Sequence, residues 1–161
     1  MKKKKLSARN ADINRLYEES VQCTEFEVSF INKLFKRYNN TRCKSLREDF
    51  CASALISAEW VRNNKDNVSI AVDLDRNMIK EAKKTSLSRL TEEQQKRMKI
   101  CYGDSSKFVS TKVDCVLATN FSYFVFKERK KLINYFQHVM KQLKNRGILM
   151  LDAFGGYEAH Q

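Results

Sequence analysis

The segment Ser45–Val61, SLREDFCASALISAEWV, decides the fold because it joins a strand to a helix through a turn of small residues. The apolar strand expected at Lys44–Glu48 ends in the carboxylates of Glu48 and Asp49. The turn CASA follows, and helical spacing begins at its third residue and predicts a helix over Ser53–Asn63. A strand that delivers acids to such a turn and a helix start is one way to hold a nucleotide-like ligand.

The rest of the chain alternates short apolar runs with helical patterns, which is typical of parallel strands joined by crossover helices. Further strands are expected at Val68–Val72, Lys99–Tyr102, Val113–Ala118 and Gly147–Asp152. Further helices are expected at Arg76–Ser88 and Lys127–Lys144. The last of these is predicted to carry one apolar face made of Leu132, Ile133, Phe136, Val139, Met140 and Leu143. The pattern predicts an α/β fold.

Two helical patterns precede the sheet, at Asp12–Val21 and Glu25–Tyr38. The apolar face of the second is expected to comprise Phe26, Phe30, Ile31, Leu34, Phe35 and Tyr38. We therefore expect residues 1–42 to form a basic tail and a helical arm, and residues 43–161 to form the α/β domain.

Composition narrows the class of protein. With 161 residues, 42% hydrophobic and 31% charged, the chain is expected to form one soluble domain, and it has no apolar run near the ~20 residues of a membrane span. The basic block Lys2–Lys5 is not followed by an apolar segment, so no export is expected. Five scattered cysteines with two histidines argue against a metal site and for a reducing compartment, the cytoplasm or alternatively the nucleus.

The formal net charge of +12 raises the question of nucleic-acid binding. The block Lys2–Lys5 supplies part of that charge, and we interpret the remainder as solvated surface lysine. Binding of RNA stays an alternative, and its candidate residues are Lys127, Arg129, Lys130, Lys131, Lys141, Lys144 and Arg146.

Acids, amides and small residues follow the expected strands, and ligands of an open parallel sheet bind beyond those carboxyl ends. Asp75 precedes a helix and is expected to cap it. Asp73, about 25 residues beyond the first acid, is placed to bind the two hydroxyls of a ribose. The later strands are followed by Asp104-Ser105, by Asn120-Phe121-Ser122-Tyr123 and by Asp152.

These residues resemble the class I S-adenosylmethionine-dependent methyltransferases, and in particular a little-characterised branch with the segments YExSVQ, LREDFCGTA, VDLD, NFSY and DxFGG. The corresponding segments here are Tyr17–Gln22, Leu46–Ala54, Val72–Asp75, Asn120–Tyr123 and Asp152–Gly156. The resemblance implies a Rossmann-like methyltransferase sheet and S-adenosyl-L-methionine as cofactor.

The resemblance also implies roles for individual residues. Residues 48–53 would wrap the methionine part of the cofactor, Asp73 would hold the ribose, and Asp104 with Ser105 would lie beside the adenine. The residues expected at the cofactor are Glu48, Asp49, Cys51, Ala52, Ser53, Asp73, Leu74, Asp104, Ser105 and Asn120. Asn120 and Tyr123 would border the methyl group and an unknown acceptor, and Tyr123 could equally be a core aromatic.

Two departures from the family concern the turn after the first strand and the length of the chain. The turn reads CASA instead of CGTA, and a left-handed alanine at position 52 costs roughly 1–2 kcal/mol, whereas at negative φ only the extra methyl group matters. Family members also continue with further strands, which this chain lacks after its fifth. The apolar edge GILML is therefore expected to be covered by a partner or a second copy, unless the sequence is a fragment.

Two functions follow from these expectations. The first is methyl transfer by in-line displacement, in which the protein aligns donor and acceptor. The second is a non-catalytic methyltransferase-like module that binds RNA or a protein partner.

Overall fold

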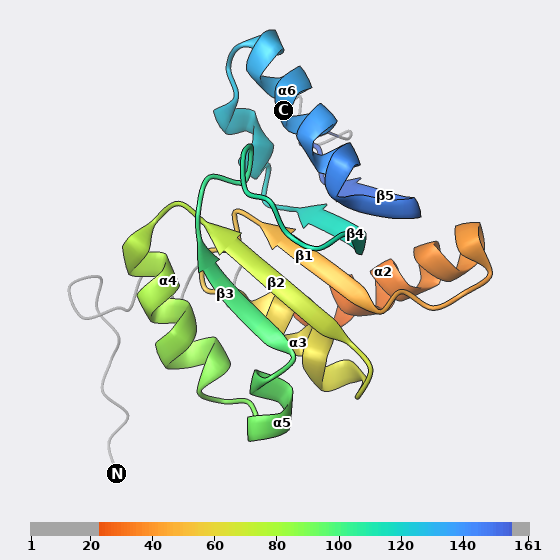
Figure 1. The fold of residues 1–161 in the computed structure, drawn as a ribbon, viewed down its shortest axis with the longest axis vertical. Helices are drawn as coiled ribbons and strands as arrows, with labels where there is room; N and C mark the ends of the chain where they lie inside the picture. Colours follow the sequence, from red (N-terminus) through yellow and green to blue (C-terminus); the bar gives the residue numbers. More distant parts are fainter. Residues whose placement is uncertain (1–22, 156–161) are drawn as a thin grey trace.

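Strand β1 (Ser45–Asp49) lies at the centre of a five-stranded sheet in the computed structural model, which describes residues 23–155 (Figure 1). The other strands are β2 (Val68–Asp73), β3 (Met98–Tyr102), β4 (Val113–Ala118) and β5 (Leu143–Leu151). Their order is β3-β2-β1-β4-β5, and every pairing is parallel. The predicted α/β class is confirmed. The helix expected at Asp12–Val21 and the segment Tyr17–Gln22 lie outside the described residues.

Helices cover both faces of the sheet. On one face, α2 (Thr24–Asn39) and α3 (Leu55–Asn63) share a hydrophobic cluster with β1 and β4, and α4 (Arg76–Ala82) shares another with α3, β2 and β3. On the other face, α6 (Arg129–Gln142) packs on β4. The central strands β1 and β4 are therefore buried on both sides, as in other parallel sheets, whereas the outer strands are only partly covered.

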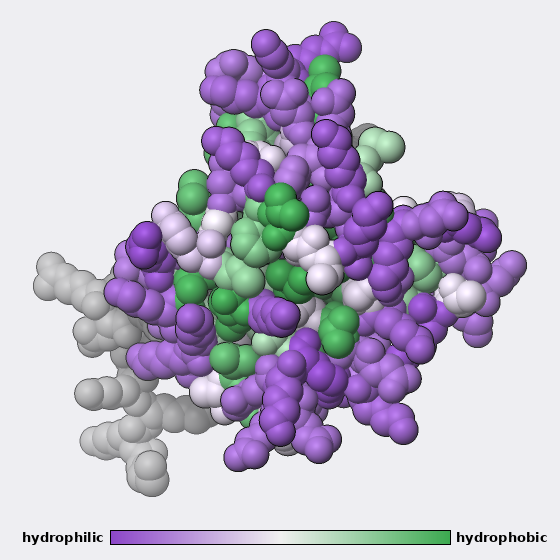
Figure 2. Space-filling view, in the orientation of Figure 1, coloured by the Kyte–Doolittle hydropathy of each residue, from purple (hydrophilic) through white to green (hydrophobic). Residues whose placement is uncertain are grey.

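The connection from β3 to β4, residues 103–112, contains no helix. A loop alone therefore lies over β2 and β3 on the face that α6 covers elsewhere. Figure 2 shows apolar side chains gathered near the centre of this face, within a hydrophilic surround. The exposed Val68 and Val109 contribute to the apolar surface of the molecule.

The apolar face predicted for α6 was partly wrong. The buried residues are Tyr135, Val139 and Gln142, whereas Ile133 and Met140 are 42% and 72% exposed. The helix is turned so that the hydroxyl of Tyr135 reaches a buried carboxylate, and a pattern of apolar residues cannot show that requirement. In α2, Phe26 is likewise exposed, while Val28 is buried.

The boundary between α6 and β5 also differs from the prediction. Helix α6 ends at Gln142, and β5 begins at the next residue, four positions before the expected start. The first residues of β5 form an irregular stretch in which Arg146 has a φ of 62°. Lys144 fixes this stretch to β4 through an ion pair of 3.0 Å with Asp114. A polar sequence that resembles a helix end is thus the start of a strand.

The helix expected at Arg76–Ser88 is present as α4 followed by a π-helical turn, η1 (Lys83–Leu87). The short helix α5 (Glu92–Gln95), which was not predicted, begins with a capping box of Thr91 and Gln94. A 3-10 turn, η2 (Ser122–Val125), follows β4. Within residues 23–155, no helix has the length and apolarity needed to cross a membrane.

Candidate cofactor site at the carboxyl edge of the sheet

The turn after β1 has three left-handed residues at alternate positions. The φ angles are 56° at Phe50, 44° at Ala52 and 57° at Ala54. Ala52 therefore occupies the conformation that a glycine would adopt most easily, at a cost of about 1–2 kcal/mol. The alternative of a negative φ at this residue was wrong. A hydrogen bond of 2.7 Å, from the Ala54 amide to the Cys51 carbonyl oxygen, closes the turn.

Asp73, at the end of β2, holds this turn in place. Its Oδ2 accepts a hydrogen bond of 2.8 Å from the Ala52 amide, and its Oδ1 accepts one of 2.8 Å from the Asp75 amide. A carboxylate has about four acceptor positions, so Asp73 keeps capacity for ligand hydroxyls. Asp75 caps α4 by accepting from the Asn77 amide at 2.7 Å, which confirms its expected structural role.

Glu48 points from β1 toward α3. Its Oε2 accepts a hydrogen bond of 2.8 Å from the Ser57 amide in the first turns of that helix. Burial raises the pKa of Glu48 to about 7, and the nearby carboxylates of Glu27 and Asp73 act in the same direction. A positive charge at this position would favour the ionised form. Glu48 is therefore suited to a cationic ligand.

Asp49 is the next residue and points to the opposite face, as alternation along a strand requires. Its Oδ1 accepts a hydrogen bond of 2.7 Å from Arg47 Nε, and its Oδ2 accepts one of 3.0 Å from the Tyr135 hydroxyl. Burial raises the pKa of Asp49, while the Arg47 guanidinium opposes this shift. The side chains of Arg47 and Asp49 are both fully buried. Contact of Asp49 with the cofactor stays a prediction, and its two oxygens already have donors.

Arg47 was not among the predicted site residues, although it connects several parts of the edge. Its Nη1 donates to the Phe108 carbonyl oxygen and its Nη2 to the Ser105 carbonyl oxygen, both at 2.9 Å. Its guanidinium carbon also lies 5.5 Å from the centre of the Phe108 ring. The sequence did contain one signal for Arg47, because a charged residue inside a buried central strand needs a partner of opposite charge.

The loop after β3 brings Asp104 and Ser105 beside the end of β2. The Gly103 amide donates to the Asp73 carbonyl oxygen at 2.9 Å. Asp104 Oδ1 accepts from the amide and the hydroxyl of Ser106, at 2.9 and 2.7 Å. Ser105 is buried, whereas Leu74 is 61% exposed and offers an apolar surface next to Asp73.

Asp152, at the end of β5, fixes the turn after β4. Its Oδ2 accepts a hydrogen bond of 2.7 Å from the Asn120 amide, and its Oδ1 accepts one of 2.9 Å from the Phe121 amide. Both donors are left-handed, with φ of 58° and 54°. Tyr123 packs against Phe124 and Phe136, at centroid distances of 4.8 and 6.4 Å. This packing supports the interpretation of Tyr123 as a core aromatic, and its catalytic role stays a prediction.

Two other residues predicted at the cofactor, Cys51 and Ser53, are buried and contribute to the packing of the turn. The Cys51 thiol is buried, and burial raises its pKa, so it is not a reactive thiolate. Ser53 is also buried, and its carbonyl oxygen accepts a hydrogen bond of 2.5 Å from the Ser86 hydroxyl. The hydrogen bond between Ser53 and Ser86 joins the turn after β1 to the turn η1.

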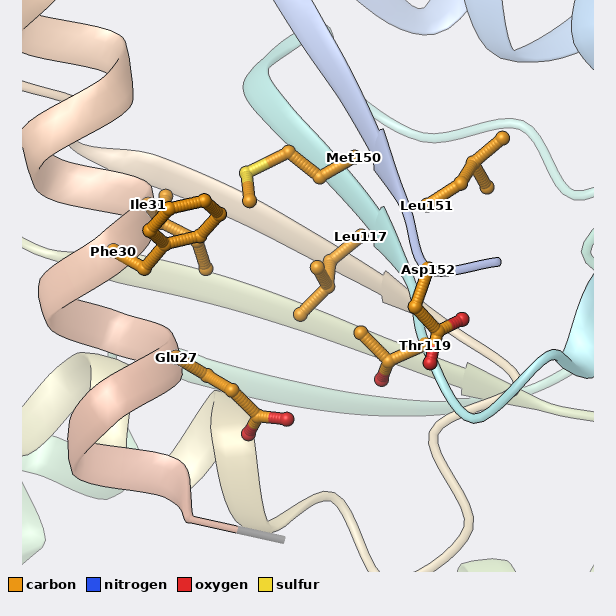
Figure 3. A pocket seen from close by; sticks show the side chains of 8 residues that line it. All are labelled: Glu27, Phe30, Ile31, Leu117, Thr119, Met150, Leu151 and Asp152. Carbon is orange, nitrogen blue, oxygen red and sulfur yellow. The ribbon is translucent and has the colours of Figure 1, made fainter. Parts of the chain in front are cut away.

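A cavity of about 170 Å³ lies beside this edge, between α2 and the ends of β4 and β5 (Figure 3). It is lined by Glu27, Phe30, Ile31, Leu117, Thr119, Met150, Leu151 and Asp152. The sequence did not indicate Glu27 or Thr119, because the cavity depends on how α2 packs against the sheet.

The residues at the edge fit S-adenosylmethionine. The cofactor carries a sulfonium charge, two ribose hydroxyls and an adenine, and the edge offers the carboxylates of Glu48, Asp73 and Asp104 with the exposed Leu74 beside them. The described part of the chain contains no group of histidine, cysteine and acidic side chains that could hold a metal ion.

Comparison with known proteins agrees with this geometry at the level of the fold. The chain resembles an S-adenosylmethionine-dependent methyltransferase of Clostridium acetobutylicum, with 19% identity, a TM-score of 0.71, and coverage of 86% of this chain and 55% of that one. It resembles DesVI of Streptomyces venezuelae with 18% identity, a TM-score of 0.73, and coverage of 95% and 61%. It resembles the sugar N-methyltransferase KedS8 of a Streptoalloteichus species with 16% identity, a TM-score of 0.71, and coverage of 98% and 61%.

The fold is therefore that of the class I methyltransferases. The chain spans 55% to 61% of the length of these three proteins. The sequence matches no protein-family model and no curated protein. The assignment to the branch with LREDFCGTA stays a prediction.

Replacing Arg47 with methionine is expected to destabilise the protein by about 3–5 kcal/mol, because it leaves Asp49 buried without its partner. Urea unfolding followed by circular dichroism measures this loss. The double variant Arg47→Met, Asp49→Asn should recover part of it. Arg62→Met is the control, since Arg62 makes a partly exposed pair of 3.6 Å with Glu59, and it should change stability by no more than about 0.5 kcal/mol. A loss below about 1 kcal/mol for the single variant would contradict the role given to Arg47.

Ala52→Gly is expected to stabilise the protein by about 0.5–1 kcal/mol, because glycine removes the strain of a left-handed alanine. The gain is smaller than the strain itself, since glycine also increases the conformational entropy of the unfolded chain. Ala58→Gly, inside α3, is the control and should destabilise by about 1 kcal/mol or more. Unfolding in urea measures both. Destabilisation by Ala52→Gly would contradict the left-handed geometry of the turn.

Proposed function

We propose that this chain binds S-adenosylmethionine at the carboxyl edge of the sheet and transfers its methyl group to an acceptor by in-line displacement. The observation that carries the proposal is the convergence of Glu48, Asp73 and Asp104 from three neighbouring strands around a left-handed turn. The fold adds support, because CalS10, an amino pentose methyltransferase of Micromonospora echinaspora with a TM-score of 0.71, was solved with S-adenosylmethionine bound.

Each part of the edge has a role in this proposal. Residues 48–53 surround the methionine part, where the buried Glu48 carboxylate attracts the cationic cofactor. Asp73 accepts from the ribose hydroxyls. Leu74 packs on the adenine, and Asp104 with Ser105 borders it.

The chain's contribution to chemistry is alignment. The cofactor supplies an activated methyl group on a sulfonium, so the protein needs to position donor and acceptor in line. Asp152 holds the backbone of Asn120 and Phe121 rigidly at the end of β4. The side-chain carbonyl oxygen of Asn120 is then available to accept a hydrogen bond from the molecule that receives the methyl group.

The alternative function is a non-catalytic module that binds RNA or a protein partner. Two of its seven candidate basic residues join distant parts of the fold: Lys144 pairs with Asp114, and Arg146 donates to the Tyr38 carbonyl oxygen at 2.7 Å. Basic residues with these internal partners are less available for phosphates. The contacts favour the methyltransferase proposal over an RNA module.

The direct test is calorimetric titration of the folded chain with S-adenosylhomocysteine. We expect saturable binding, and Asp73→Asn should weaken it about tenfold or more because it removes a charged acceptor while keeping the shape. Asp75→Asn is the matched control: it lies two residues away, caps α4, and asparagine caps equally well. The affinity of the Asp75→Asn variant for S-adenosylhomocysteine should stay within about twofold of the wild type. No saturable binding at millimolar ligand, or equal losses in both variants, would contradict the proposal.

A further inference from the structure

The cavity between α2 and the ends of β4 and β5 has a polar end and an apolar wall. Glu27, from the first turn of α2, points across it toward Thr119 and Asp152, which come from the ends of β4 and β5 (Figure 3). Phe30, Ile31, Leu117, Met150 and Leu151 form the rest of the lining. None of the eight lining residues is basic, although the chain as a whole carries a net charge of +12.

One carboxylate oxygen of Glu27, Oε2, is buried and has no hydrogen-bond donor among the residues that the structure describes. Burial raises the pKa of Glu27, and the negative charge of Asp152 raises it further. A buried carboxylate oxygen without a donor costs free energy, so a ligand that brings a positive charge and N–H donors stabilises this end of the cavity.

Asp152 faces the same space but differs from Glu27 in its partners. Its two oxygens accept from the amides of Asn120 and Phe121, which leaves it free acceptor positions for one further donor. The Thr119 hydroxyl adds a third polar group beside them. The polar end therefore suits an ammonium group, which donates up to three hydrogen bonds to two carboxylates and a hydroxyl.

The position of the cavity connects it to the proposed function. Thr119 immediately precedes Asn120, and Asp152 both lines the cavity and fixes the turn where the methyl group is expected. A ligand in the cavity would thus lie next to the methyl donor. The remaining wall is made of aliphatic and aromatic side chains, which favour an apolar body on the ligand.

We propose that this cavity binds the methyl acceptor, and that the acceptor is a primary or secondary amine carried on an apolar group. The proposal rests on the proposed function. Glu27 accepts one proton from the bound ammonium, and the freed nitrogen lone pair forms a bond to the methyl carbon of the sulfonium donor. The carbon–sulfur bond breaks, its electron pair stays on sulfur, and S-adenosylhomocysteine and the protonated N-methylamine are the products.

Binding of a probe amine tests the cavity without relying on activity. Cyclohexylamine is titrated against cyclohexanol, which has nearly the same shape and no charge, and the affinities are compared by NMR titration of the 15N-labelled chain. We expect cyclohexylamine to bind at least about tenfold more tightly, with shifts at the amides of Thr119 and Met150. Glu27→Gln should remove about tenfold of that affinity, whereas Glu25→Gln, an exposed acid in the same helical turn, should leave it unchanged.

The same titrations with and without S-adenosylhomocysteine separate this inference from the proposed function. If S-adenosylhomocysteine binds but the amine and the alcohol bind equally or not at all, the amine pocket is wrong and the cofactor site stands. If the amine binds through Glu27 but S-adenosylhomocysteine does not, the pocket stands and the methyltransferase proposal fails. The comparison of amine with alcohol uses the wild-type chain, so it remains decisive even if Glu27→Gln does not fold.

Discussion

The buried ion pair of Arg47 and Asp49 is the interaction on which the carboxyl edge of the sheet depends. Both side chains are fully buried in the central strand, where an unpaired charge would cost several kcal/mol. Arg47 meets this constraint by binding the carbonyl oxygens of Ser105 and Phe108, and Asp49 meets it by binding Tyr135. The pair therefore fixes the loop after β3 and the rotation of α6 at the same time.

The alternation of side chains along β1 separates structure from chemistry. Arg47 and Asp49 point to the face of α6, whereas Glu48 points to the face of α3 and lies near Glu27 and Asp73. One strand thus supplies both the support of the edge and a carboxylate whose raised pKa makes it responsive to a nearby cation. Asp73 and Asp152 also combine the two roles. Each carboxylate accepts from backbone amides of a left-handed turn and keeps further acceptor positions for a ligand.

The sequence predicted the order of strands and helices well, because the apolar runs and the acids at their ends are local features. It predicted less where a contact spans distant segments. The apolar pattern of α6 could not reveal that Tyr135 must reach Asp49, and the polar start of β5 resembles a helix end until Lys144 is seen to pair with Asp114. The cavity at Glu27 was also inaccessible from the sequence, since three elements far apart in the chain form it.

The central claim is that the carboxyl edge of the sheet binds S-adenosylmethionine. The most direct measurement is a map of amide chemical shifts in the 15N-labelled chain as S-adenosylhomocysteine is added. We predict that the shifts concentrate at Ala52, Leu74, Asp104 and Asn120, while the exposed residues of α6 keep their positions. Shifts centred on the basic residues of α6, or none at saturating ligand, would contradict the claim.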